Sequence, residues 1–567
     1  MVVLITSVYH PLSALAQTSS QITPPTFQPR PPRTASFSIP EGSGLSAPKG
    51  AEKLQLTLSG LQITGGRPEF GSKEAALEVK LTRQEISGAD VFAAARELEA
   101  AYAAAGFVLV RVILPPQKLT KGSSLRLTVI DGFIEKIELK DIPERVRERV
   151  KNLLEPLIGK RGIKLSEIER QVLFASDTPG VLLRSTLAPG TEVGGTLLVV
   201  EARHKALMAS ITADNSLSKA LGQSAPSIGI DANSVGGLGE LFYIRAGGVT
   251  NFSSDGFFSN YPLNRSLSIG LSMPLSVDGL SFTAEYTDAR TTPSTASGIK
   301  TTDTFDRFSL RLRYAWTRSR SMNLYSEAVL DFEDETRSLF VGGIPTPLSL
   351  DRLRILRLNN EGDLATPWGA TIAGRVTFSF GIDGLGARAA PSTVAALPLS
   401  RQGATAAFQK AEIALGYGQI IADHLATNIS FRAQTSFNRA LVHAEQFGIT
   451  GPSGLSTFSS GTVAGDQGYV ARAEISSPWL VPYPPFKVMM RVAPYVFGAT
   501  GEVGLVRPTA VEVGSIRASS FGAGIRIGGT HSTALSDGSL NLEYGHSTRN
   551  DGGAAINRFS IATGLKF

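Results

Sequence analysis

The feature that most constrains this chain is a long series of short alternating segments, which runs from residue 206 to the last residue. One segment, residues 308–314, places four apolar side chains on one face and three polar ones on the other, namely Phe308, Leu310, Leu312 and Tyr314 against Ser309, Arg311 and Arg313. Residues 267–271 and 280–286 repeat the pattern, and the last ten residues end it with Phe567 on the apolar face. Gly, Asn, Asp and Pro separate the segments, and no helical period lies between them. Such a pattern predicts a transmembrane β-barrel.

The charge density divides the chain near residue 204. Residues 51–203 contain 22 Lys+Arg and 20 Asp+Glu, whereas residues 204–567 carry 58 charges in 364 positions. Division of the second part by about 23 residues per strand and connection gives about 16 strands. We therefore predict a mainly β fold in which two small α/β domains precede a barrel over residues 204–567. An array of soluble β-sandwiches is the alternative.

The same counts exclude several classes of protein. The net charge of +6 is spread thinly and forms no basic stripe, so we expect no nucleic-acid partner. The absence of Cys excludes disulfides, Cys-ligated zinc and thiol nucleophiles. The six His lack metal-ligand spacing, and no P-loop, H-E-x-x-H or G-x-S-x-G motif occurs. No apolar run reaches the roughly 18 residues of a membrane-spanning helix. We expect neither an enzyme nor a cofactor or metal.

The first fifty residues predict a targeting segment and a linker. The apolar stretch that begins at Val2 precedes Ala14-Leu15-Ala16, which has the small–x–small form of a signal-peptidase site. We therefore expect a signal peptide over residues 1–16. Residues 17–50 contain seven prolines, which disfavour a long helix and indicate an extended linker.

Two α/β domains are expected between the linker and the barrel. In the first, residues 51–131, Asp90 and Gly106 mark the start and the stop of a helix, and Gly122 marks a turn between two strands. The second, residues 132–203, has a helix, two Pro-Gly turns and a final strand. Ordinary turn chemistry explains each Pro-Gly pair when it is taken singly.

Taken together, however, the residues of these domains resemble a known family. Their order and spacing are similar to the two POTRA domains of TpsB-type transporters of two-partner secretion, the haemolysin secretion/activation proteins. The first domain carries this resemblance at Tyr102, Gly106, Pro115, Gln117, Gly122 and Gly132. The second carries it at Asp177, Pro179, Gly180, Pro189 and Gly190. The terminal Phe567 is similar to the aromatic residue on which outer-membrane barrels end.

A third region, residues 445–473, resembles loop 6 of this family. The resemblance rests on Gly451, Pro452, Gly454, Leu455, Ser456, Thr457, Phe458, Asp466 and Gly468. The family has an Arg where Ser456 stands, and that Arg pairs with an Asp of a facing strand. The facing strand is identified by Phe497, Ala499 and Gly501, so Ala499 replaces the Asp. Loss of both charges leaves neither one buried without a partner. We expect uncharged contacts to hold the loop inside the barrel.

The resemblance implies an outer-membrane transporter with its POTRA domains in the periplasm. These domains would take up an unfolded client by adding it as a strand to a sheet edge, and the barrel would export it without ATP. The implied partners are a large secreted β-helical protein, outer-membrane lipid and the barrel-assembly machinery, which meets the C-terminal strand. The alternatives are an insertase of the same superfamily and a passive porin. Family members commonly plug the pore with a helix, and no amphipathic helix precedes Ala51, so either the plug is absent or a non-helical segment fills the lumen.

Overall fold

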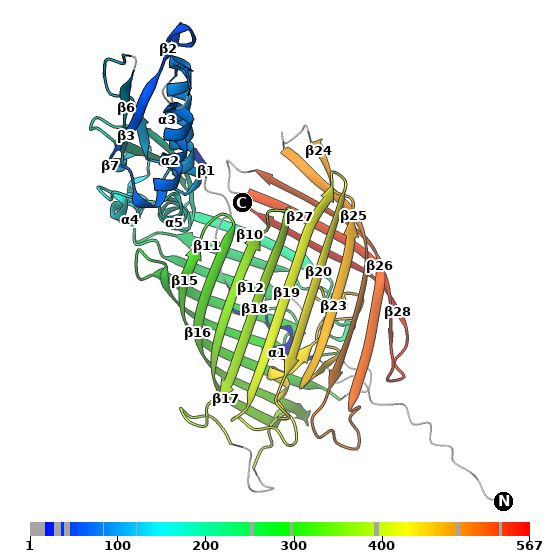
Figure 1. The fold of residues 1–567 in the computed structure, drawn as a ribbon. Coiled ribbons are helices and arrows are strands. Elements are labelled where there is room, and N and C mark those ends of the chain that lie inside the picture. Colours follow the sequence, from blue (N-terminus) through cyan, green and yellow to red (C-terminus); the bar gives the residue numbers. More distant parts are fainter. Residues whose placement is uncertain are drawn as a thin grey trace, which may run out of the picture.

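The computed structural model describes residues 17–27, 36–38, 46–82, 84–120, 122–249, 255–294, 299–389, 396–483, 488–531 and 536–567. The predicted signal peptide, residues 1–16, lies outside the described residues. Figure 1 shows two small α/β modules beside one end of a barrel, which we call the near mouth. No helix in the described ranges is long and apolar enough to cross a membrane.

The barrel is closed and antiparallel throughout its described strands. These are β10 (Leu207–Asp214), β11 (Ser227–Asn233), β12 (Leu241–Gly248), β13 (Asn264–Pro274), β14 (Leu280–Thr291), β15 (Thr301–Arg318), β16 (Met322–Val341), β17 (Ile344–Ala365), β18 (Ala370–Gly381), β19 (Gln409–Ala422), β20 (Leu425–Thr435), β23 (Gln467–Ser476), β24 (Trp479–Tyr483), β25 (Val488–Gly504), β26 (Ser515–His531), β27 (Ser536–Arg549) and β28 (Ile556–Lys566). Because β23 and β24 pair with successive parts of β25, they form one wall strand. The wall therefore has sixteen strands, as the sequence predicts.

Side chains alternate across this wall as expected. On β15, Phe308 and Leu312 face outward with 41% and 46% of their surface exposed, while Arg311 between them points into the lumen and is buried. About 9–11 residues per strand suffice to cross a bilayer. The 20 residues of β16 and the 22 of β17 exceed that length, so their hairpin continues beyond the membrane at the far mouth.

The first module packs two helices on a three-stranded sheet. Its elements are β3 (Leu58–Thr64), α2 (Gly71–Thr82), α3 (Gly88–Ala104), β5 (Arg111–Ile113) and β6 (Ser123–Ile130), with a small pair β2 (Gln55–Leu56) and β4 (Ile86–Ser87). The N-cap of α3 is Ser87, and Asp90 completes a capping box as the third helical residue. The sequence prediction that placed Asp90 itself at the cap is therefore wrong by one turn, because the Asp carboxylate binds back to the Ser87 amide.

The second module repeats this order of elements. It contains β7 (Phe133–Lys140), α4 (Glu144–Leu154), α5 (Leu165–Ser176), β8 (Val181–Pro189) and β9 (Gly195–His204). Its sheet has the order β1-β8-β9-β7, because β1 (Ser36–Ser38) joins it parallel to β8. The packing of α4 and α5 on this sheet buries an apolar core of its own.

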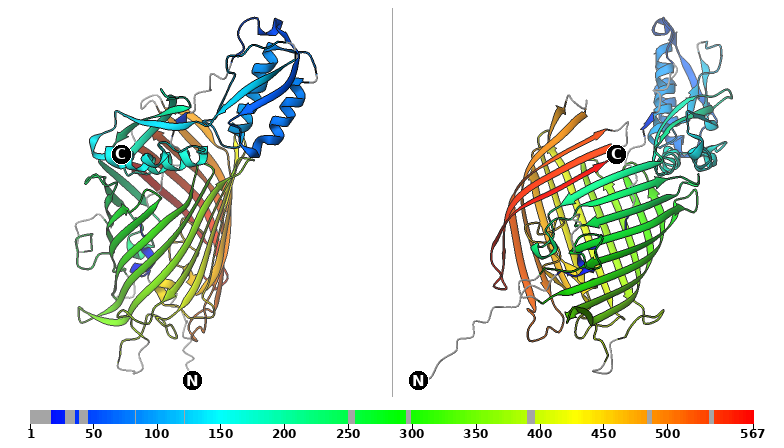
Figure 2. Two further views of the ribbon diagram at one scale, coloured as in Figure 1. Left: turned by 60° about the vertical axis from the view of Figure 1, so that its left-hand side comes forward. Right: turned by 180° about the vertical axis from the view of Figure 1, so that it is seen from behind.

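The segment predicted as a linker over residues 17–50 does more than connect. Residues 17–27, with the single helical turn α1 (Ser19–Ile22), lie inside the barrel, as the blue segment in Figures 1 and 2 shows. Residues 36–38 then add an edge strand to the second module. A segment that is extended apart from one short helical turn thus lies in the pore. Of the two possibilities that the sequence leaves open, an absent plug or a non-helical segment in the lumen, the structure shows the second. The prolines of this segment explain why no longer helix forms.

Candidate functional site: the occupied lumen and its near mouth

The first turn of the lumenal segment is held by carboxylates of the barrel wall. The Ser19 amide donates to Asp303 Oδ1 at 2.9 Å, and the Ser20 amide donates to Glu335 Oε1 at 3.1 Å. The Ser19 hydroxyl also donates to the Asp303 carbonyl at 2.7 Å. The first amides of a helix have no partner within the helix, so the wall supplies what a four-residue turn lacks.

The other end of the segment is clamped around Phe27. Its amide donates to Glu285 Oε2 at 2.9 Å, and its ring lies 4.8 Å from the ring of Tyr243 and 4.2 Å below the Arg245 guanidinium. Arg311 donates to the Phe27 carbonyl at 3.4 Å and to the hydroxyl of Thr26. The described contacts of the segment are mostly polar, so water can replace them if the segment leaves the lumen.

The part of loop 6 that precedes β23, residues 445–466, folds back into the barrel and lies beside the lumenal segment, as Figures 1 and 2 show. Its short strands β21 (Phe447–Gly448) and β22 (Ala464–Gly465) pair with each other, and its apolar residues form a buried cluster with the wall. Leu455 and Phe458 of the predicted tip belong to that cluster, as does Ala499 of β25. Glycines let the loop approach the wall: a Cβ on Gly501 would lie 3.2 Å from the Ile449 side chain, and one on Gly545 would lie 2.5 Å from the Thr457 side chain.

The polar contacts of the loop tip differ from the expectation of an uncharged attachment. Ser456 donates to Glu543 of β27, and its oxygen accepts a 2.6 Å hydrogen bond from Arg472 of β23. Arg472 and Glu543 themselves form a buried ion pair at 2.6 Å. Ala499 of β25 lies opposite Arg472 of β23 in the sheet register, and the described polar contacts of Ser456 do not include Ala499. The tip carries no charge, but it binds to a charged pair that the wall provides.

Sequence reasoning missed Arg472 and Glu543. Both sit at inward-facing positions of the barrel strands β23 and β27, where an isolated charge would be costly. The guanidinium of Arg472 lies 3.9 Å from the centre of the ring of Phe497, and Phe497 is the first residue of the facing-strand motif. The available signal was a pair of opposite charges at lumenal positions, but nothing in the sequence indicates that β23 and β27 meet.

The base of loop 6 is organised by Asp466, which is fully buried. Its carboxylate pairs with Arg401 at 2.5 Å and accepts the amides of Leu441 at 3.0 Å and Val506 at 2.6 Å. Three connections of the far mouth therefore converge on one side chain. Gly468 follows on β23, where a Cβ would lie 2.2 Å from the Glu502 carbonyl oxygen. The remaining loop positions are turn residues: Gly451 with a φ of +104°, the exposed Pro452 and the buried Gly454.

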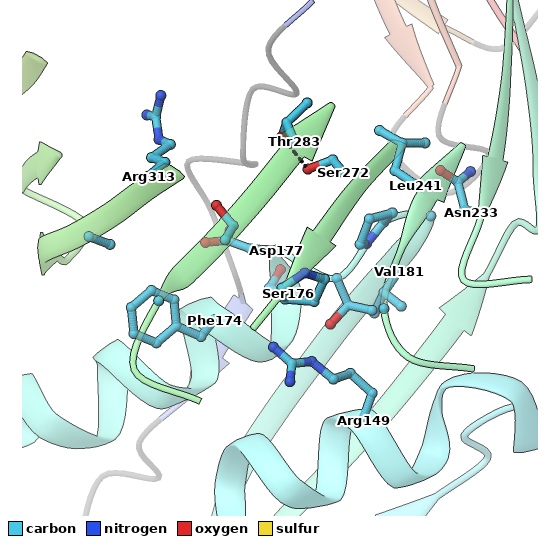
Figure 3. Close-up of a pocket in the computed structure, with 18 of the residues that line it drawn as sticks. Arg149, Phe174, Ser176, Asp177, Val181, Asn233, Leu241, Ser272, Thr283 and Arg313 are labelled. Carbon is cyan, nitrogen blue, oxygen red and sulfur yellow. Dashed lines mark hydrogen bonds between the residues drawn. The ribbon is translucent and has the colours of Figure 1, made fainter. Parts of the chain in front are cut away.

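The near mouth contains a cavity of about 650 Å³ between the second module and the barrel (Figure 3). Arg149, Phe174 and Val181 line it from the module, and Phe27 of the lumenal segment lines it from inside the pore. Asp177, which the sequence singled out, holds the two walls of this cavity together. Its carboxylate accepts two hydrogen bonds of 2.8 Å from Arg318 at the end of β15.

The other singled-out residues are structural. Tyr102 is buried and accepts the Arg67 amide at 2.9 Å, and Gln117 pairs through its amide with both backbone groups of Arg126. Pro115 lies just upstream of that contact. The turns use Gly106, Gly122 and Gly180 at positive φ, and close approaches fix Gly132 and Gly190. After Pro189, the Glu135 carboxylate accepts hydrogen bonds from the Glu192 amide and from the hydroxyl and amide of Thr191. These bonds lower the pKa of the Glu135 carboxyl.

Phe567 closes the barrel through two backbone hydrogen bonds with Ala209.

A family comparison matches this architecture. The sequence pattern of the family described as haemolysin secretion/activation protein ShlB/FhaC/HecB matches residues 194–527, more than half of the chain. The chain belongs to this family. A second pattern, the ShlB-type POTRA domain, matches residues 57–132, which form the first module. The ShlB/FhaC/HecB assignment makes the chain an outer-membrane β-barrel protein of two-partner secretion.

Curated relatives share part of their length with this ShlB/FhaC/HecB-family chain. The heme/hemopexin transporter protein HuxB of Haemophilus influenzae is 24% identical over 193 residues, which is 33% of this chain and 34% of that protein. The hemolysin transporter protein ShlB of Serratia marcescens is 28% identical over 192 residues, which is 34% of this chain and 33% of that protein. The aligned part thus spans about one third of these relatives.

Solved structures resemble the fold over nearly the whole chain. CdiB from Escherichia coli has a TM-score of 0.67 at 18% identity, and the match covers 97% of this chain and 94% of CdiB. CdiB from Acinetobacter baumannii has a TM-score of 0.59 at 16% identity, with 91% and 90% of the two chains covered. At these identities the likeness concerns the fold alone.

Proposed function

We propose that this chain exports a secreted polypeptide across the outer membrane through its own barrel, after the two modules bind that polypeptide in the periplasm. The observation that carries the proposal is the cavity at the near mouth. It joins a surface of the second module to a lumen whose filling segment is held mainly by polar contacts. Because Phe27 lines this cavity, an extended chain guided there would reach the lumenal segment.

The relatives support a protein as the cargo. HuxB is named a heme/hemopexin transporter and ShlB a hemolysin transporter. By analogy we propose a large secreted β-helical protein as the client and transport, not catalysis, as the activity. Outer-membrane lipid would surround the barrel, and the barrel-assembly machinery would receive the C-terminal strand that ends at Phe567. An insertase and a passive porin remain the alternatives, and a filled lumen disfavours the porin.

Two deletions of the full chain test the proposal. Deletion of residues 53–131 should abolish secretion of the client while the barrel still reaches the outer membrane. Deletion of residues 17–27 should raise the conductance of the purified protein in a planar bilayer, because the segment no longer fills the pore. Secretion that survives the first deletion would contradict the proposed role of the modules. Conductance unchanged by the second would contradict the proposed route.

A further inference from the structure

The two modules are joined by a connection of only two residues, Asp131 and Gly132, which lies between β6 and β7. Figures 1 and 2 show the second module against the near mouth and the first module beyond it, farther from the barrel. The angle at this connection therefore decides where the first module lies relative to the mouth. Neighbouring domains of one chain ordinarily move relative to each other unless an interface between them prevents it.

The connection between α3 and β5 belongs to both modules. Phe107 and Val110 are buried in the core of the first module, whereas Leu109 between them is buried in the core of the second. The Gly106 carbonyl just before them accepts the amide of Leu165, the first residue of α5, at 2.8 Å. An apolar contact has no preferred direction, so this contact and one hydrogen bond hold the modules together but leave rotation about the connection possible.

Asp131 limits that rotation, because it binds to both modules at once. Its carboxylate pairs with Arg67 of the first module, with 3.0 Å between Arg67 Nη2 and Asp131 Oδ2. The other carboxylate oxygen accepts the Gly162 amide of the second module at 3.2 Å. The Asp131 backbone carbonyl accepts a hydrogen bond of 2.9 Å from Arg161, which precedes Gly162. One residue thus ties the β3–α2 connection to the turn that precedes α5.

The side chain of Arg67 is itself packed between the two modules. Its guanidinium lies 4.3 Å from the centre of the Phe107 ring, and Lys164 of the second module lies 5.4 Å from the centre of the same ring. A Cβ on Gly162 would lie 2.3 Å from Arg67 Nη2, so the turn of the second module directly contacts this side chain. Cations from both modules therefore meet at Phe107, and Asp131 supplies a carboxylate beside them.

We propose that Asp131 is a positioning residue, which fixes the angle between the two modules and so holds the first module where it can pass the exported polypeptide to the near mouth. This inference rests on the proposed export function and names a residue that acts on export through the placement of the first module. The side chains of Arg67 and Asp131 are 28% and 32% exposed, and an ion pair this exposed adds little stability. Loss of the carboxylate should therefore free the angle without unfolding either module.

The chain has no Cys, so pairs of spin labels can be placed at chosen positions of the full-length protein in lipid nanodiscs. Labels at Lys73→Cys on α2 and Asn152→Cys on α4 report the distance between the modules, and both positions are exposed. Labels at Lys73→Cys and at the exposed Lys118→Cys both lie in the first module and give an internal reference. Double electron–electron resonance measures the width of each distance distribution.

Asp131→Ala should broaden the distance distribution between the modules at least about twofold and leave the internal reference unchanged. Asp131→Glu should restore most of the narrow distribution, because it keeps a carboxylate within reach of Arg67. The matched control is Glu97→Ala, which removes an ion pair of 2.7 Å with Lys80 inside the first module. An unchanged distribution in Asp131→Ala would overturn the proposal, and so would equal broadening in Glu97→Ala.

Export is the second readout, and its probe is a large secreted protein whose secretion depends on the natural chain in its own host. Asp131→Ala should lose most of this export, whereas Asp131→Glu and Glu97→Ala should keep it. Amide hydrogen exchange over residues 125–129 and 198–202, in the cores of the two modules, should stay at the rate of the natural chain.

Normal export by Asp131→Ala, despite a broadened distribution, would overturn the positioning role. Faster hydrogen exchange in both cores would also overturn it, because Asp131 would then stabilise the fold of the modules and not their angle. If no secreted protein depends on the natural chain, the proposed export function fails, while the distance measurements still decide whether Asp131 fixes the two modules.

Discussion

Arg472 of β23 and Glu543 of β27 form an ion pair of 2.6 Å inside the barrel, and Ser456 at the tip of loop 6 binds to both side chains. Two strands, β25 and β26, separate the paired residues in the wall. The pair is buried, with 8% and 3% of its two side chains exposed. The uncharged tip of the loop therefore rests on charges that come from two separate wall strands.

Removal of one member of this pair should release the loop. Arg472→Met leaves the buried Glu543 with the hydroxyls of Ser456 and Tyr495 as its described hydrogen-bond partners, so we expect a loss of about 3–5 kcal/mol in the free energy of unfolding. Urea titration of the protein in lipid vesicles measures this loss, and protease cleavage within residues 447–465 reports the release. The matched control is Arg517→Met, since Arg517 pairs with Glu502 on the exposed surface and should contribute at most about 1 kcal/mol. Equal losses in the two variants would contradict a role for burial.

The arginine that pairs with Glu543 can also be moved from position 472 on β23 to position 456 at the loop tip. Ser456→Arg alone places a second guanidinium beside Arg472, so it should destabilise the barrel by like-charge repulsion. Ser456→Arg combined with Arg472→Ser should recover stability, because the tip arginine then faces Glu543 without a competitor. We expect an interaction energy between the two substitutions of roughly 0.5–3 kcal/mol. Additive effects in the same urea titration would show that the two side chains do not share Glu543.

The junction between the second module and the barrel depends on Asp177 and Arg318. Asp177→Asn keeps the shape of the side chain but removes its charge, and it leaves Arg318, with a side chain only 2% exposed, without a carboxylate there. We expect weaker docking of the module, seen as faster hydrogen exchange over residues 165–189 with little change in β15. The control is Glu169→Gln, whose partner Arg320 lies at 3.5 Å and is 42% exposed. If both variants exchange alike, Asp177 does not hold the junction.

Local pattern predicted the wall well and the lumen poorly. The alternation around Phe308 and Leu312 predicted the barrel, because a two-residue period reports which face meets lipid. The strand number followed from the length of residues 204–567. The contacts of Asp303, Glu335 and Arg401 could not be predicted, since they join residues up to several hundred positions apart. Pro24 and Pro25 lie in the extended part of residues 17–27, as the sequence indicates, but polar serines carry no pattern that tells a lumenal segment from a linker. Only closure of the barrel brings Ser19 to Asp303.

The lipid boundary gives a test of the barrel register. Leu312→Arg should cost about 2–4 kcal/mol of folding free energy if Leu312 lies near the bilayer midplane. The matched control is Val341→Arg at the tip of the long β16–β17 hairpin, where an exposed apolar residue is likewise replaced. That tip lies beyond the membrane, so the cost there should stay within about 0.5 kcal/mol. Folding titrations into lipid vesicles measure both, and a larger cost at Val341 would contradict the membrane placement.

The end of β9 makes the second module sensitive to acid. His204 lies where β9 leads into the barrel, and its Nε2 atom is buried without a described hydrogen-bond partner. Burial lowers the pKa of His204, and the nearby Arg145 lowers it further, against opposing effects of the Asn233 backbone and Glu240. In the unfolded chain a histidine titrates near about 6.5. Between that value and the lower folded pKa, the unfolded state binds more protons, so the stability present above about pH 7 declines as the pH falls through 6.5.

We therefore expect the second module to lose stability as the pH is lowered from 7.5 to 5.5. Hydrogen exchange over residues 181–204 in the full chain measures this loss. His204→Gln should keep the shape of the position and flatten this dependence, because its amide does not titrate. If the variant loses stability over that pH range as steeply as the natural chain, another group causes the acid sensitivity, and His204 is not the titrating residue at the junction.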